Sequence, residues 1–522
     1  MRRVNNINQT LKPSSRFSEK SNYFFYFCQI TASTWRPRWM CSDCDVCSGI
    51  TIAKRIFTIE DLHSEGSTIT MPRSGLGPPI NTFTRDAAMQ QSRRQFLKAG
   101  ALGVAAASSL ASLRSVHAAE NNVLKVGLVG CGGRGRGAVK DALSADPNAR
   151  LVAVCDAFPE IAASAVRGFK EAQAFGDRVD VTPETTFDGL EAYKKVIELC
   201  DVVLLCETPH FRPMSLRYAV DKGKHIFCEK PVAVDAPGIR SVMESAQIAR
   251  EKKLQLVSGL CWRYDHNVKE MMKRVQDGAI GDVLSVRETY LTGKLWTRPR
   301  KEGDTEMMFQ CRNWYNFTWL SGDGNTEQHI HSLDKGLWAF GDKPPVAAFG
   351  VGARMQRVEQ PDYGDIYDSM GVVYEYEGGR AIYAYYRQQN KCYNDTDDYF
   401  CGTKGHAAIL KGIINGEKVP KVESNMYLQE HQALFNAIRS GGQTYINNGE
   451  YMAYSTMLAI LGRMVCYSGK RLTWDEAINS TQSLAPSAYT WDATPPTLPD
   501  ENGRYKVEIP GVGPVYHQVV RS

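Results

Sequence analysis

The chain lacks an apolar run long enough to cross a bilayer, and it lacks the charge excess typical of a nucleic-acid-binding protein. The mild apolar stretch from Ala99 to Leu113 is shorter than the roughly 20 residues that a transmembrane helix needs. The net charge is +5, but residues 1–118 hold 15 Lys or Arg against 7 Asp or Glu, while the rest hold 47 against 50. The basic excess therefore belongs to the leader, and we expect neither a stable membrane span nor a nucleic-acid partner.

The 14 cysteines lack the spacing of a disulfide scaffold. Several lie in or beside apolar runs and are expected to be small buried side chains, namely Cys155, Cys200, Cys206 and Cys228. Cys41, Cys44 and Cys47 form a C-x-x-C-x-x-C pattern that His63 would complete as a zinc site. The first 88 residues show no hydrophobic periodicity, however, so we predict no metal site there.

Residues 89–119 have the pattern of an export signal. Arg93 and Arg94 are followed by Phe-Leu-Lys, a short apolar stretch and the small-residue ending Val116-His117-Ala118-Ala119. The arginine pair resembles the twin-arginine signal of bacteria. We therefore predict a periplasmic protein that uses the twin-arginine machinery, or one held loosely at the membrane by an uncleaved signal. Because Met89 directly precedes the signal, residues 1–88 are interpreted as an unstructured leader or as sequence ahead of the true start.

A glycine-rich loop follows the first expected strand, which runs from Val123 to Val129. In the sequence Gly130-Cys-Gly132-Gly133-Arg134-Gly135, the first glycine permits a tight turn and the second lets backbone N–H groups approach a pyrophosphate. Gly135 permits close packing of the following helix on the strand. The spacing predicts a dinucleotide site that includes Gly133 and Arg134.

Asp156 ends a second apolar strand, Leu151 to Cys155, about twenty residues beyond the last glycine of the loop. A carboxylate at this position accepts hydrogen bonds from the ribose hydroxyls of NAD and repels the 2′-phosphate of NADP. We therefore predict NAD as the cofactor. NADP stays open as an alternative, because Arg134 and Arg136 lie close by in the loop.

The pattern of strand and helix then repeats, with further expected strands at residues 201–206, 225–228 and 254–257. A helix is expected from Gly238 to Lys252. This alternation predicts an α/β domain over residues 120–258 with a doubly wound parallel sheet, the Rossmann arrangement. Because ligands of such sheets bind at the carboxyl ends of strands, Thr208, Pro209 and His210 are candidate cofactor contacts.

Glu229-Lys230-Pro231, which follows the strand at residues 225–228, resembles a motif of the Gfo/Idh/MocA oxidoreductases when it is taken with the glycine loop. The resemblance extends from about Val123 to about Ala477. It continues in the segments Gly259-Leu-Cys-Trp-Arg263-Tyr264, Glu327-Gln-His-Ile-His331-Ser-Leu-Asp334, Gly402-Thr-Lys-Gly405 and Ala437-Ile-Arg-Ser-Gly441.

The resemblance implies reversible hydride transfer between NAD(P) and a carbinol carbon, usually of a sugar or cyclitol. By the family pattern Lys230 supplies a charge near the nicotinamide and the substrate hydroxyl, and Glu229 and Pro231 shape its loop. His331 matches the acid/base imidazole, whose unperturbed pKa lies near neutrality. Arg263 is a further candidate cofactor contact.

Glu327 stands where the family commonly carries Asp, four residues before His331. If this stretch is helical, both side chains lie on one face, and the carboxylate can bind a substrate hydroxyl or orient the imidazole. His329 replaces the usual Gly and is expected either to point away from the site or to crowd it. Asp334 is expected to support the helix that carries His331.

The second domain is expected over residues 259–480 as an α+β unit with an open-faced, mostly antiparallel sheet, and the Pro-rich tail over 481–522. A strand is expected from Val283, and a hairpin over residues 370–386 with a glycine turn. The family commonly uses the open sheet face for oligomer contacts, so we expect a homo-oligomer. Leu295 to Trp319 is rich in Trp, Arg and Asn, which suits either a sugar site or a protein contact.

These features predict an NAD-linked dehydrogenase of a small sugar-like molecule. An NAD-dependent glycoside hydrolase that oxidises and then re-reduces its sugar is the first alternative, because retained NAD would serve an enzyme outside the cytoplasm. A non-catalytic nucleotide-binding protein is the second, with Glu327 and His329 as marks of lost chemistry.

Overall fold

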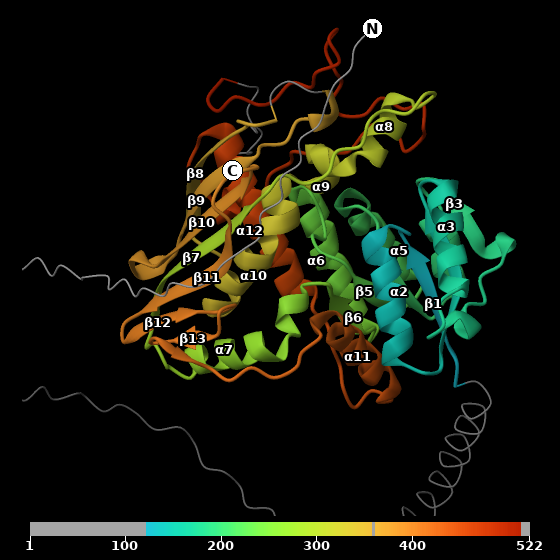
Figure 1. Cartoon of the computed structure of the whole chain (residues 1–522), viewed down its shortest axis with the longest axis horizontal. Helices are drawn as coiled ribbons and strands as arrows, with labels where there is room; N and C mark the ends of the chain where they lie inside the picture. The colour runs from blue at the N-terminus through green and yellow to red at the C-terminus, as the bar shows by residue number, and fades with distance from the viewer. Residues whose placement is uncertain (1–121, 358–360, 513–522) are drawn as a thin grey trace, which may run out of the picture. The chain divides into compact units, whose positions relative to one another are not determined.

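The computed structural model describes residues 122–357 and 361–512, which contain two β-sheets (Figure 1). The predicted leader, the Arg93–Arg94 signal and the cysteine pattern at 41, 44 and 47 with His63 lie outside the described residues. None of the helices between residues 122 and 512 that the structure describes is long and apolar enough to cross a membrane. The ten cysteines of the described part are free thiols, as predicted.

The first sheet has six parallel strands, which confirms the doubly wound arrangement. Its order is β3-β2-β1-β4-β5-β6, so the order reverses between β1 and β4. Ligands of such sheets bind beside this switch point, outside the carboxyl ends of the strands. The strands are β1 (Leu124–Val129), β2 (Ala149–Asp156), β3 (Thr186–Asp188), β4 (Val202–Leu205), β5 (His225–Cys228) and β6 (Leu256–Ser258).

Helices cover both faces of this sheet, because its strands are apolar on both sides. Val202 and Leu204 of β4 pack with one core, whereas Val203 and Leu205 pack with the other. The first core includes side chains of α2 (Gly133–Ala145) and α3 (Pro159–Lys170). The second includes side chains of α4 (Tyr193–Leu199), α5 (Arg212–Asp221) and α6 (Ala236–Glu251).

The second sheet has nine strands in the order β14-β13-β12-β11-β7-β10-β9-β8-β15. Neighbouring strands are antiparallel except β7 and β10, which confirms a mostly antiparallel sheet. The predicted hairpin is present as β9 and β10. The strands are β7 (Val283–Thr292), β8 (Ala347–Ala353), β9 (Ser369–Glu375), β10 (Ala381–Gln388), β11 (Asp395–Gly402), β12 (Gly405–Ala408), β13 (Ile413–Ile414), β14 (Glu417–Lys418) and β15 (Leu472–Thr473).

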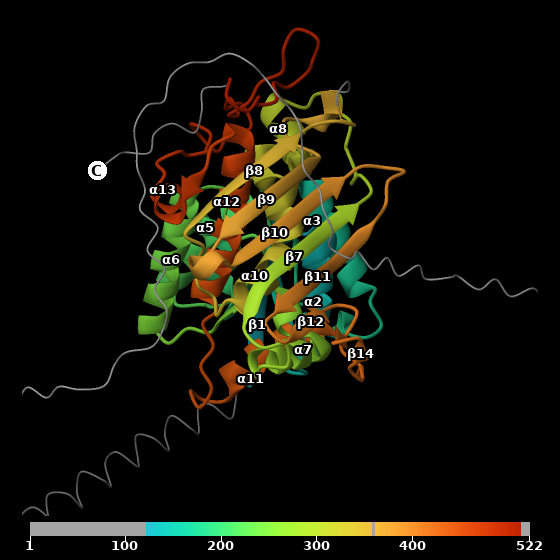
Figure 2. The same cartoon turned by 90° about the vertical axis from the view of Figure 1, so that its left-hand side faces the viewer.

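Helices pack on one face of the second sheet and leave the other face open (Figure 2). On the open face Phe349 of β8 and Tyr383 of β10 flank Val373 of β9 in register, and both side chains are exposed. The described helices of this region are α7 (His266–Gln276), α8 (Glu306–Arg312), α9 (Thr318–Ser321), α10 (Ile330–Ala339), α11 (Met426–Arg439), α12 (Gly449–Ser468) and α13 (Trp474–Ile478). Short 3-10 turns lie at Gly176–Arg178, Pro183–Thr185, Pro209–Phe211, Cys261–Arg263, Trp314–Asn316, Pro361–Tyr363 and Glu377–Gly379.

Helix α12 joins the two sheets into one body. Of its 20 residues 17 are buried, as expected of a helix that is apolar on all sides. Its side chains belong to the same core as Ile239 of α6 and Ile330 of α10. Helix α11, which the sequence assigns to the second domain, places Leu434 and Phe435 in the core of the first sheet. The two cores therefore do not separate at residue 258, and the spacing between the sheets is fixed by packing.

The tail beyond Ser480 packs over the chain itself. The Trp491 ring stacks on Phe158, with centroids 5.3 Å apart. Gln310 of α8 donates a hydrogen bond of 2.8 Å to the backbone oxygen of Thr497, and the Tyr505 ring meets Phe317 edge-on. The described part of the tail thus supports the segment around α8.

We predict that Gly135→Ala destabilises the protein, because a Cβ there would lie 1.9 Å from the backbone oxygen of Gly130. The forced shift is expected to lower the free energy of unfolding by about 1–3 kcal/mol, as overpacking does. Urea denaturation measures the change. The matched control is Gly137→Ala in the same helix, where a Cβ would meet only the Arg134 guanidinium, at 3.3 Å, and the cost is expected to be much smaller. Equal stability of the Gly135→Ala and Gly137→Ala proteins would contradict this packing.

Candidate active site

A cavity of about 1030 Å³ lies where the carboxyl ends of β1, β2, β4 and β5 face the second sheet. The first domain lines it with the glycine loop and with residues that follow the strands, including Asp156, Thr208, Glu229 and Lys230. The second domain lines it from β7, from α10 and from the π-helical turn η6 (Asn325–His329) that leads into α10. The cavity therefore lies at the switch point where the strand order predicts a ligand site.

The glycine loop has the geometry that a dinucleotide pyrophosphate requires. Gly130 has φ +89°, and a Cβ there would lie 2.5 Å from the backbone nitrogen of Glu207. Gly132 and Gly133 have no atom within 4 Å of a Cβ position, so their backbone is open to the cavity. Helix α2 begins at Gly133 without a side-chain cap, which leaves N–H groups of its first turn available to an anion. These residues fit a bound dinucleotide.

Asp156 is held against the glycine loop at the end of β2. Its carboxylate accepts hydrogen bonds from the backbone N–H groups of Cys131, at 2.8 Å, and Phe158, at 3.1 Å. Burial raises the pKa of Asp156, and these two hydrogen bonds oppose that shift. The side chain still lines the cavity, so it can accept hydrogen bonds from ribose hydroxyls.

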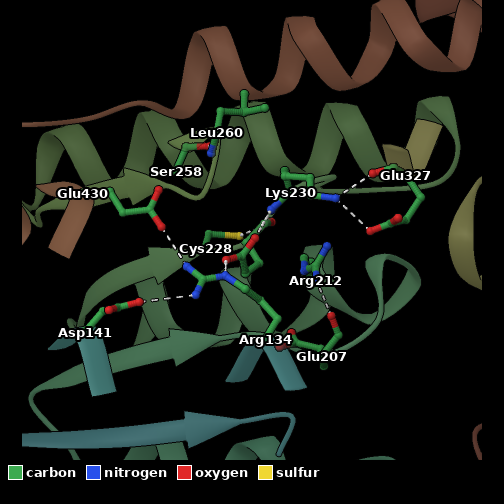
Figure 3. Close-up of polar contacts among 11 residues, drawn as sticks. Arg134, Asp141, Glu207, Arg212, Cys228, Lys230, Ser258, Leu260, Glu327 and Glu430 are labelled. Carbon is green, nitrogen blue, oxygen red and sulfur yellow. Dashed lines mark hydrogen bonds and ion pairs between the residues drawn. The ribbon is translucent and has the colours of Figure 1, made fainter. Parts of the chain in front are cut away.

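The two arginines that left NADP open are engaged by the protein. Arg136 donates to the backbone oxygen of Cys131 and to Ser164 Oγ, each at 3.2 Å. Arg134 forms ion pairs with three carboxylates instead of pointing freely into the loop (Figure 3). The Arg134 guanidinium is neutralised by carboxylates and Arg136 is not part of the cavity lining, which favours NAD.

We predict that Asp156→Ala weakens NAD⁺ binding by about 10-fold or more, because a charged acceptor of two hydroxyls is lost. Calorimetric titration of the full chain with NAD⁺ and NADP⁺ measures the effect. The preference for NAD⁺ over NADP⁺ is expected to shrink, since the negative charge that repels the 2′-phosphate is gone. An unchanged preference would place the ribose elsewhere.

Arg134 links three parts of the chain. Its guanidinium contacts Glu229 after β5, lies 2.7 Å from Glu430 of α11 and lies 3.6 Å from Asp141 of α2 (Figure 3). Burial raises the pKa of Glu430 well above its ordinary value, and the neighbouring Glu229 adds to the shift. The predicted cofactor residues Arg134 and Glu229 thus line the cavity while their charged ends bind each other.

Lys230 meets Glu327 across the two domains (Figure 3). Its Nζ donates hydrogen bonds of 2.8 Å to Glu327 Oε1 and 2.6 Å to the Glu327 backbone oxygen. The Lys230–Pro231 peptide bond is cis. The sequence predicts Glu327 on the same face as His331. The two residues lie in consecutive helical segments, η6 and α10, and both line the cavity. The Glu327 carboxylate binds Lys230 and Gln328.

His331 lines the cavity from the first turn of α10. Its Nδ1 is buried and has no hydrogen-bond partner among the described residues. Burial lowers the pKa of His331 well below its ordinary value, and the positive charges of Lys230, Lys335 and Arg134 lower it further. Burial and these charges therefore favour the neutral form of the imidazole. His329 points away from the cavity and contacts Asn325 Oδ1 at 3.0 Å, so it does not crowd the site.

Three predicted cofactor residues are not part of the cavity lining, so their contact with the cofactor stays a prediction. Arg263 is buried and forms ion pairs with Asp334, at 2.9 Å, and Asp342, at 2.6 Å, so it anchors α10. His210 lies 3.0 Å from the Tyr489 hydroxyl of the tail. Pro209 is buried beside it at the start of a 3-10 turn.

The structure adds lining residues that the sequence pattern did not single out, namely Trp262, Tyr290, Gln328, Lys335 and Tyr427. They come from strands, loops and helices whose order in space depends on the packing of the second domain. Glu207 also lines the cavity, and burial raises the pKa of its carboxyl group. Its place directly after an apolar strand is a signal that sequence reasoning could have used.

The Trp- and Arg-rich segment predicted as a sugar site or contact surface also lines the cavity, through Trp296, Arg298, Arg312 and Trp314. The Arg312 guanidinium lies 3.8 Å from the Phe158 ring centroid, and it pairs with Glu160 of α3 at 2.6 Å. The segment thus crosses to the first domain close to Asp156 and covers that end of the cavity.

Residues 124–260 match the model of the oxidoreductase family with an NAD-binding Rossmann fold, GFO_IDH_MocA. The inositol 2-dehydrogenase of Rhizobium meliloti (strain 1021) is 29% identical over 286 residues, which are 55% of this chain and 75% of that protein. The glycosyl hydrolase family 109 protein 1 of Bacteroides fragilis (strain YCH46) is 29% identical over 174 residues, which are 33% of this chain and only 35% of that protein.

A solved structure shares the two-sheet fold. The scyllo-inositol dehydrogenase from Lactobacillus casei with bound NAD(H) and scyllo-inositol is 19% identical, with a TM-score of 0.51. The alignment covers 68% of this chain and 99% of that one. At this identity the likeness concerns the fold alone.

Proposed function

We propose that this chain, an NAD-dependent dehydrogenase whose residues 124–260 belong to the Gfo/Idh/MocA oxidoreductases, transfers hydride between NAD and a hydroxyl-bearing carbon of a sugar or cyclitol. The observation that carries the proposal is that Lys230, Glu327 and His331 line the same cavity as the glycine loop and Asp156. The inositol dehydrogenases among its relatives support a polyhydroxylated substrate.

Lys230, Glu327 and His331 have different roles in the oxidation of an alcohol. NAD, when bound, supplies a hydride acceptor at its nicotinamide ring. Neutral His331 takes the hydroxyl proton as general base. Lys230 uses two of its three N–H donors on Glu327, and the third can stabilise the alkoxide that develops as the proton leaves. Glu327 acts by holding that ammonium group in place.

We predict that Lys230→Met and His331→Asn each lower kcat/KM by about 10²-fold or more, the usual effect of losing an electrostatic stabiliser or a general base. The measurement is NADH absorbance with a panel of cyclitols and sugars. Lys343→Met removes an exposed lysine and serves as the control. An active wild type whose rate is unchanged by both substitutions would contradict these roles.

NAD-dependent glycoside hydrolysis is the second candidate, favoured by the family 109 relatives over their shared 174 residues. The same residues would oxidise the sugar and later return the hydride, so net NADH would not accumulate. Assays with aryl glycosides separate the two candidates. Release of the aryl alcohol without net reduction of NAD⁺ supports hydrolysis, whereas accumulation of NADH without release supports the dehydrogenase.

We also propose that the chain is exported through the twin-arginine machinery, on the strength of Arg93-Arg94 and the segment that follows.

The open face of the second sheet, with exposed Phe349, Val351, Tyr383 and Tyr385, supports a homo-oligomer. Analytical ultracentrifugation of the full chain reads the oligomeric state, and a monomer at all concentrations would oppose that part of the proposal.

Replacing both arginines, Arg93→Lys with Arg94→Lys, is expected to stop export while the net charge stays the same. The machinery recognises the arginine pair itself, and a guanidinium differs from an ammonium in shape and donor geometry. Cell fractionation of a bacterial host that expresses both forms measures the periplasmic share. An equal periplasmic share for the two forms would exclude the twin-arginine route.

A further inference from the structure

A second lysine lines the cavity one helical turn beyond His331. Lys335 of α10 is 1% exposed, yet it belongs to the cavity lining. Its Nζ donates to the backbone oxygen of His331 and lies 3.1 Å from Asp398 Oδ2. Its Nζ also lies 5.4 Å from the centroid of the Trp262 ring, and Trp262 lines the cavity as well. These contacts fix the position of the ammonium group.

Two buried carboxyl groups lie close to Lys335. Glu288 of β7 and Asp398 of β11 face each other in register, and both are 0% exposed. Glu288 forms no ion pair with any described residue. A Cβ at Gly336 would lie 2.1 Å from Glu288 Oε1, so the glycine beside Lys335 lets this carboxyl group reach the helix.

We infer one positive and one negative charge in the cluster of Lys335, Glu288 and Asp398. Two carboxylates this close in a dry environment cannot both ionise against a single ammonium. Burial, and then the charge of Asp398, raises the pKa of Glu288 well above its ordinary value. Burial also raises the pKa of Asp398, to about 6, and the charge of Lys335 opposes that shift. The other polar groups that face the cluster are Ser332, Asp334, Tyr374, Tyr376 and Asp397.

One of the N–H donors of the Lys335 ammonium group has no acceptor among the described residues. An ammonium group has three N–H donors. The His331 backbone oxygen and Asp398 take two of them, and the group borders the cavity. Lys230 is in the same situation, with two donors on Glu327 (Figure 3). A purely structural ion pair would explain the contact with Asp398, but not a third donor at the cavity wall.

We propose that Lys335 is a second substrate-binding cation, which donates a hydrogen bond to a hydroxyl oxygen of the bound polyol and is held in place by the buried carboxyl pair Glu288 and Asp398. The proposal rests on the proposed function, since it names the group that the site recognises. It makes the site selective for substrates with a second hydroxyl besides the one oxidised, and it adds Lys335 to the residues that determine specificity.

The test uses the full chain loaded with NAD⁺ and myo-inositol as the probe. Lys335→Met alone leaves Asp398 without its counter-ion and is expected to be destabilised. The double variant Lys335→Met with Asp398→Asn removes both charges together and is the informative one. Its KM or Kd for myo-inositol is expected to rise about 10-fold or more, as for loss of a charged hydrogen bond. Lys343→Met is the matched exposed control.

The outcomes separate this inference from the proposed function. Weaker inositol binding by the double variant, with the wild-type affinity for NAD⁺, supports the role of Lys335. Wild-type inositol affinity in the double variant overturns it, and so does a wild type that binds NAD⁺ but not myo-inositol. A wild type that binds inositol without reducing NAD⁺ contradicts only the proposed function, because the comparison of binding affinities still stands.

A stability measurement tests the carboxyl pair without any substrate. Because the folded-state pKa of Glu288 lies above that of an unfolded chain, its contribution to stability is full at low pH and is lost as the pH rises through the folded value. Gln has no proton to lose. The Tm of Glu288→Gln is therefore expected to exceed that of the wild type by a margin that grows from about pH 5 to about pH 9.

The control for this measurement is Glu417→Gln, which changes an exposed carboxylate of β14. It reports any pH dependence that comes from removing a carboxylate at the surface. If the Glu288→Gln margin grows no more with pH than that of the control, the charge arrangement proposed for Lys335 is wrong.

Discussion

The ion pair between Lys230 and Glu327 is the contact on which the site depends. Lys230 follows β5 at the carboxyl end of the parallel sheet. Glu327 lies in the turn that leads into the helix of His331. Each alone would be a polar residue at a domain surface. The shared core around α12 holds the two domains at the distance where their side chains meet. Packing of apolar residues therefore sets the geometry of the charged ones.

Buried cations surround His331 and favour the neutral form of its imidazole. Arg134, Lys230 and Lys335 each have carboxylate partners, so none is an isolated buried charge. Their combined field still acts on His331, which has no carboxylate partner, and it holds the pKa of the imidazole low. The same arrangement favours the negative charge that develops on a substrate oxygen as its proton leaves.

The sequence pattern predicted those parts of the site that depend on residues close together in the chain. The glycine loop and Asp156 after β2 follow from strand periodicity and from the rule that ligands meet strand ends. The role of Lys230 after β5 came only from the resemblance to the Gfo/Idh/MocA oxidoreductases. The sequence did not predict the directions in which these side chains point. Glu327 binds Lys230 across the two domains, and Arg263 forms ion pairs with Asp334 and Asp342.

The approach of Glu288, Asp398 and Lys335 lay beyond sequence reading, because it depends on the register of β7 with β11. We propose that one cavity holds NAD, with Asp156 binding the ribose and with Lys230 and His331 at the place of hydride transfer. A crystal structure of the full chain grown with NAD⁺ tests it most directly. We predict nicotinamide C4 within contact distance of both side chains. Density for NAD⁺ in another orientation, or only at another site, would contradict the account.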